Sequence, residues 1–107
     1  MGRRSDLIGA IEATGSTFAY GTITVTDVAV AIPTTNLPNR KAITIFNMSK
    51  NADEIVYIGN SAVTTANGYP LQPSQGLPFD LSDGAKIYGI AEAGQSISVR
   101  WLEIDNS

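Results

Sequence analysis

The 107-residue chain contains no cysteine and no histidine. It can therefore form neither a disulfide nor a thiolate nucleophile, and it lacks the usual ligands of a structural zinc site. It also lacks the commonest general acid–base group and the histidine of a Ser-His-Asp site. A carboxylate pair is the remaining catalytic option, but the ten Asp and Glu residues show no spacing that marks one. We expect a protein that is not an enzyme and holds neither metal nor cofactor.

Charged residues and long apolar runs are also scarce. Only 16% of the residues are charged, the net charge is −3, and the only basic doublets are Arg3-Arg4 and Arg40-Lys41. A nucleic-acid-binding protein would carry a basic face, and a membrane span would need about 20 apolar residues in a row. We expect neither nucleic acid nor membrane as a partner. Because small secreted domains often depend on disulfides, their absence favours an intracellular origin or a place in a larger assembly.

Two regions differ in pattern. Residues 1–20 contain three glycines and no clean alternation of apolar and polar residues. We interpret them as an N-terminal arm that becomes ordered against a neighbour; a frayed terminus is the alternative, and the arm could be helical from Ser5 or extended. The apolar content of 43% is enough for one core, which we place in residues 21–107.

Residues 21–107 show short alternating segments separated by turn residues. In residues 22–26, Ile23 and Val25 alternate strictly with threonines, and the break at Asp27 predicts a bend or bulge. Expected strands cover residues 22–26, 28–32, 40–47, 54–59, 76–81, 85–90 and 96–104. With no convincing helix, this pattern predicts an all-β chain: an antiparallel β-sandwich or jelly-roll-like domain with an N-terminal arm.

The outward positions of these strands are rich in hydroxyl groups. They are Thr22, Thr24, Thr26, Thr44, Ser96 and Ser98. Uncharged strand faces protect poorly against association between sheets, so this composition favours a protein that works within an assembly.

Two other groups of residues could form sites. Oxygen ligands suited to Ca²⁺ come close together at Asp80, Ser82, Asp83 and Gly84. Their spacing is not that of an EF-hand, so we favour a solvated turn capped by aspartate. An aromatic platform for sugar rings or a peptide could form from Tyr57, Tyr69, Tyr88 and Trp101. We favour packing roles for these aromatic residues.

Several segments together resemble a small structural protein that recurs in tailed-phage genomes. They are Arg40–Asn47, Val56–Leu71, Phe79–Leu81, Ile87–Ala91 and Ser98–Glu103, and the resemblance extends over about residues 36–103. It implies a phage virion protein, made in the host cytoplasm and located on the capsid surface, with no catalytic residues to carry over. The function that it implies is that of a decoration (cement) protein, which stabilises the shell by bridging neighbouring major capsid subunits.

From the resemblance and the arm together we expect a homodimer or homotrimer that contacts the major capsid protein through the arm. The candidate interface residues are Arg3, Arg4, Leu7, Ile8 and Ile11. The three apolar side chains would anchor the arm, and the two arginines would pair with acidic groups of the shell. The alternative function is a tail, fibre or receptor-binding module that binds host surface glycans.

Overall fold

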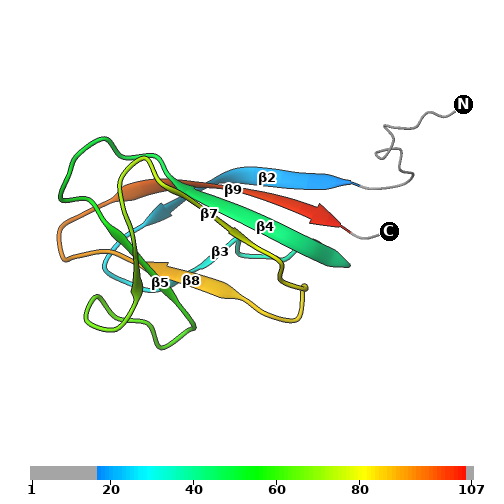
Figure 1. The fold of residues 1–107 in the computed structure, drawn as a ribbon. Helices are drawn as coiled ribbons and strands as arrows, with labels where there is room; N and C mark the ends of the chain where they lie inside the picture. Colours follow the sequence, from blue (N-terminus) through cyan, green and yellow to red (C-terminus); the bar gives the residue numbers. More distant parts are fainter. Residues whose placement is uncertain (1–16, 106–107) are drawn as a thin grey trace, which may run out of the picture.

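The computed structural model describes residues 17–105, which form eight β-strands (Figure 1). The strands are β2 (Phe18–Val25), β3 (Val30–Ile32), β4 (Arg40–Asn47), β5 (Val56–Gly59), β6 (Tyr69–Leu71), β7 (Gly76–Phe79), β8 (Ile87–Ile90) and β9 (Ile97–Asp105). The described part of the chain contains no helix, as the sequence pattern predicts.

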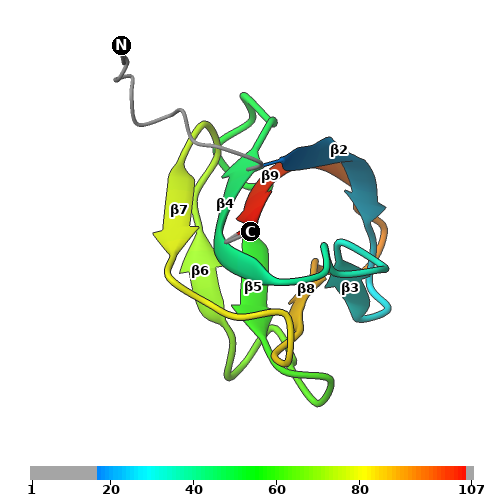
Figure 2. The ribbon, with the colours of Figure 1, turned by 90° about the vertical axis from the view of Figure 1, so that its right-hand side faces the viewer.

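The strands form two antiparallel sheets that face each other (Figure 2). Their strand orders are β2-β9-β4-β7 and β3-β8-β5-β6. The pairings are nested along the chain: β2 pairs with β9, β3 with β8, β4 with β7 and β5 with β6. This is the strand order of a jelly roll, in which one long hairpin is rolled into two sheets. The predicted fold class is confirmed.

The core lies between the sheets and consists mainly of β-branched residues, which suit a pleated surface. Its fully enclosed members include Val25, Ile32, Ile43, Ile45, Leu71, Ile97 and Val99. The core is tightly filled at Gly89, where an added Cβ would lie 2.7 Å from Ile32 Cδ1. A side chain at this position would have to displace the side chains of Ile32 on β3 and Val56 on β5, the two neighbouring strands of the same sheet.

Several strand boundaries differ from the predicted ones. β2 begins at Phe18, so three residues expected in the N-terminal arm belong to the sheet. β6 lies within a stretch expected to be a long loop. The predicted bend at Asp27 is present, because there the chain leaves one sheet for the other. Val28 belongs to this bend and is exposed, whereas the alternation predicted that it continues the strand.

Arg40 is buried at the start of β4 and binds a buried carboxylate. Its Nη1 atom lies 2.8 Å from Oε2 of Glu103 on β9, and both side chains are inaccessible to solvent. The guanidinium also donates to the carbonyl oxygens of Leu81, Ser82 and Ala85. These bonds hold the chain between β7 and β8 in a loop, which explains why both strands are shorter than predicted. Since Arg40 is buried, it adds nothing to a basic surface.

Asn47 has the corresponding role at the other end of β4. Its Nδ2 atom donates to the carbonyl oxygens of Glu54 and Leu71, and its Oδ1 atom accepts from the backbone N–H of Ser49. The side chain is fully buried. One buried polar residue at each end of β4 therefore fixes the loops that close the sandwich.

The Arg40–Glu103 pair predicts a strongly non-additive mutational response. Because Arg40 is the cation paired with Glu103, Arg40→Met leaves a buried carboxylate without its counter-charge. Oε1 of Glu103 already has no hydrogen-bond partner in the described structure. We expect the free energy of unfolding to fall by about 3–5 kcal/mol. The double variant Arg40→Met/Glu103→Leu should recover a large part of this loss. Urea unfolding followed by Trp101 fluorescence measures both. A loss below about 0.5 kcal/mol in the single variant would contradict this role.

Candidate functional site

The outer face of the β2-β9-β4-β7 sheet, meaning the side turned away from the other sheet, carries most of the predicted hydroxyl residues. Thr22 and Thr24 on β2, Thr44 on β4 and Ser98 on β9 are exposed there, as is Ser96 just before β9. The prediction that these residues point outward is confirmed for them. The structure adds that all five are associated with the same sheet.

Arg100 lies in the middle of this outer face. The strand registers place it opposite Thr22 on β2 and opposite Phe46 on β4. Next to this row, Ser98 lies opposite Thr24. The centre of the face therefore combines one cation with hydroxyl groups and one aromatic ring.

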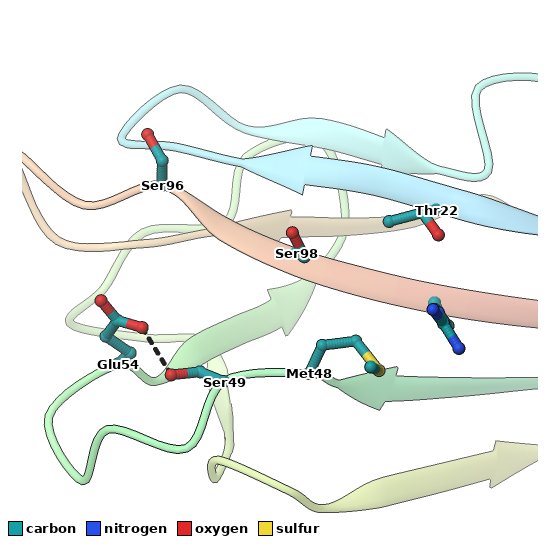
Figure 3. Close-up of a pocket in the computed structure, with 7 residues that line it drawn as sticks. Thr22, Met48, Ser49, Glu54, Ser96 and Ser98 are labelled. Atoms are coloured by element: carbon teal, nitrogen blue, oxygen red, sulfur yellow. Dashed lines mark hydrogen bonds between the residues drawn. The ribbon is translucent and has the colours of Figure 1, made fainter.

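A hollow of about 370 Å³ opens on this face (Figure 3). Its lining residues are Thr22, Met48, Ser49, Glu54, Ser96, Ser98 and Arg100. The Ser49 hydroxyl donates to Oε1 of Glu54 and accepts from the N–H of Asn51, so it serves to brace its loop. The remaining hydroxyl groups and Arg100 can donate hydrogen bonds to a polar group placed in the hollow.

A strip of exposed apolar side chains lies on the same outer face. Phe18 and Tyr20 on β2 are 65% and 77% exposed, Leu102 on β9 is 42% exposed and Phe46 on β4 is 36% exposed. The register places Tyr20 opposite Leu102, and Leu102 opposite Thr44. We call Phe18, Tyr20, Leu102 and Phe46 the apolar strip. Apolar groups gathered in this way typically mark a contact with another macromolecule.

The sequence pattern did not lead us to predict this strip. Phe18 and Tyr20 fall within the predicted arm, although they continue the alternation of Thr22 and Thr24 toward the N-terminus. Leu102 was not singled out, although the alternation of Ile97, Val99 and Trp101 with Ser98 and Arg100 places it on the outward side of its strand. Extending the two-residue period to residue 18 could have found the first two.

The structure does not bring the four candidate platform aromatics together. Tyr57, Tyr69 and Tyr88 belong to one sheet and Trp101 to the other. Tyr57 is half-buried, and the loop before β6 packs closely on it: a Cβ added at Gly68 would lie 2.7 Å from the Tyr57 Cβ. For Tyr57, the packing role is the better interpretation.

The oxygen-rich turn at residues 80–84 belongs to the loop between β7 and β8, and it is hydrogen-bonded to the loop between β3 and β4. The Asp83 carboxylate accepts from the N–H of Asn39, and the Asp83 carbonyl oxygen accepts from the Asn36 side chain. The Asp83 carboxylate thus caps a neighbouring loop. The sequence had predicted that an aspartate caps the turn at residues 80–84 itself. Within residues 17–105, no group of three or more acidic side chains is arranged to hold a metal ion.

The candidate interface residues of the predicted arm, Arg3, Arg4, Leu7, Ile8 and Ile11, lie outside the described residues. The described surface offers a second candidate for the same role, the outer face with its hydroxyl groups and apolar strip.

The apolar strip should contribute little to the stability of the isolated chain. Leu102→Ser removes a half-exposed side chain, and we expect the free energy of unfolding to change by less than about 0.5 kcal/mol. The matched control on the same strand, Val99→Ser, places a hydroxyl in the core and should cost about 2 kcal/mol or more. Urea unfolding of both variants measures the difference. Similar losses in the two would show that Leu102 has a role in the fold.

Among residues 17–105 no helix has the length and apolar character that crossing a membrane requires. Searches of known protein families, curated proteins and solved structures find no match to this chain.

Proposed function

We propose that the chain is a non-enzymatic structural protein of a phage virion, and specifically a capsid decoration protein. It would bind the outer surface of the shell and bridge neighbouring major capsid subunits. The observation that carries the proposal is the outer face of the β2-β9-β4-β7 sheet, which is poor in charge and exposes four large apolar side chains. The resemblance of residues 36–103 to a small phage structural protein supports the same function.

The physical basis of such a function is repetition. A contact of modest area becomes effective when symmetry repeats it over a particle, because each additional contact forms at a high local concentration. Hydroxyl-rich strands with exposed aromatic rings suit this task, because the Arg100 guanidinium is the one charged group at the centre of the face that a partner would have to pair. The jelly-roll fold is used by viral capsid domains and by lectins, so the fold alone does not decide between shell binding and sugar binding.

One feature of the same sheet favours the alternative, a tail, fibre or receptor-binding module that recognises host glycans. A hollow of about 350 Å³ is lined by Tyr20, Gly21, Thr22, Arg100 and Trp101. An aromatic ring beside hydroxyl and guanidinium donors is a combination that can hold a sugar ring. Binding of the purified protein to a glycan array, without binding to capsids, would favour this alternative.

A capsid-binding assay tests the main proposal. We expect the full-length protein to bind expanded capsids of the encoding phage from which this protein has been stripped. The variant Leu102→Ser/Phe46→Ser should bind at least about tenfold more weakly, because two apolar contacts are lost. A second variant, Leu7→Ser/Ile8→Ser/Ile11→Ser, tests the contribution of the predicted arm in the same way.

The control for this assay is Lys50→Ser, which changes an exposed loop residue away from the apolar strip and should bind like the wild type. Co-sedimentation and thermal stability of the decorated particles give two independent readings. If the wild-type protein neither sediments with the capsids nor raises their stability, the proposal is wrong.

A further inference from the structure

The two sheets have four edge strands, and three of them carry features that prevent pairing with another strand. β3 has only three residues, β6 has three residues and includes Pro70, and β7 has four residues and includes Pro78. Short length and proline are the usual protection of sheet edges. These three edges are poor templates for a further strand.

The fourth edge strand, β2, has none of these features. It is eight residues long, contains neither proline nor a charged residue, and pairs along its whole length with β9. In the described part of the chain no strand lies along its other edge, where it forms the margin of its sheet (Figure 2). A long, uncharged edge of this kind is a ready template for another strand.

The direction of the backbone groups on β2 follows from one hydrogen bond. The N–H of Asp105, the last residue of β9, donates to the carbonyl oxygen of Thr17, which directly precedes β2. Thr17 and Asp105 therefore occupy a hydrogen-bonded position of the ladder between β2 and β9. Because such pairs alternate along an antiparallel ladder, the even-numbered residues from Phe18 to Thr24 direct their backbone N–H and C=O groups toward the free edge.

The side chains at this edge are also incompletely covered. On the inner face, Ala19, Gly21 and Ile23 are only partly buried, whereas Val99, paired with Ile23 on β9, is fully buried. An additional strand beside β2 would place its own side chains next to these partly buried residues and cover them from the side. Within residues 17–105, this edge therefore has both backbone groups without a strand partner and partly exposed apolar surface.

We infer that β2 pairs with β2 of a second copy, antiparallel and related by a two-fold axis, so that two four-stranded sheets join into one. With Gly21 opposite Gly21, Phe18 lies opposite Thr24 and Tyr20 lies opposite Thr22. This register pairs all of the free backbone groups in about eight hydrogen bonds. It also keeps the outward residues of both copies on one face, because the opposing residues have the same parity.

A second copy fits this edge for reasons of symmetry and charge. An antiparallel two-fold contact is self-complementary, so one strand supplies both sides of the interface. No charged side chain on β2 opposes its own copy across the axis. The apolar strips of the two copies would form one continuous surface across the joined sheets. This dimer rests on the proposed function and specifies how copies of the chain join one another. It can be tested on the purified protein, without a capsid.

The experiment measures the oligomeric state of the full-length protein by analytical ultracentrifugation from about 1 to 100 μM. We expect the wild-type protein to form a dimer. The double variant Tyr20→Lys/Thr22→Lys places like charges opposite each other twice, and its dimer dissociation constant should rise at least about tenfold. Thr22→Pro, which removes a backbone N–H that faces the free edge, should weaken the dimer without unfolding the chain. Circular dichroism checks the fold of each variant.

Charge reversal tests the identity of the partner. Mixing Tyr20→Lys/Thr22→Lys with Tyr20→Glu/Thr22→Glu should restore a mixed dimer, because each introduced lysine then opposes a glutamate. The control Thr44→Lys/Ser98→Lys adds the same charge to the same outer face away from the edge, and it should dimerise like the wild type. A monomeric wild-type protein at 100 μM would overturn the inference. It would be overturned equally if the control dissociated as readily as the edge variant, or if the mixture failed to associate.

Discussion

The buried ion pair between Arg40 and Glu103 is the interaction on which the closed shape of the sandwich depends. It joins β4 to β9, and the remaining donors of the guanidinium hold the loop between β7 and β8. The Glu103 carboxylate also accepts the backbone N–H of Leu37 from the loop between β3 and β4. Two loops and two strands thus converge on one buried charge. A buried ion pair of this kind adds little net stability, because the free energy of removing both charges from water offsets most of their electrostatic attraction. Its main effect is to fix the arrangement of the segments that it joins.

With its interior and both ends fixed in this way, the part of the molecule that the structure describes offers two features for contact with other molecules. The outer face of the β2-β9-β4-β7 sheet exposes hydroxyl groups and large apolar side chains, and the β2 edge exposes backbone groups. The two features adjoin, since Phe18 and Tyr20 belong to both. A chain that joins copies at its edge while presenting a broad apolar face would combine self-association with binding to a repeated surface. This combination is what the proposed role on a capsid requires.

The sequence predicted the fold class and the bounds of β4, because Ile43 and Ile45 alternate cleanly with polar neighbours. It did not predict β6, whose three residues include a proline and show no alternation. Glu103 and Asp105 continue the inward positions of Ile97 and Val99, yet a carboxylate in such a pattern equally well marks the end of a strand. Recognising Glu103 as buried requires its partner, which lies 63 positions away in the chain. Local alternation can place Phe18 and Tyr20 outward, but the gathering of the four residues into the apolar strip depends on the register of three strands, which no local pattern determines.

We propose that the outer face of the β2-β9-β4-β7 sheet is a contact surface in an assembled particle. The most direct measurement is a cryo-electron microscopy map of the virion that carries this chain, at a resolution that shows side chains. We expect the chain on the outside of the shell, with Leu102 and Phe46 buried against a major capsid subunit. A map in which the chain is bound but this face points into solvent would contradict it.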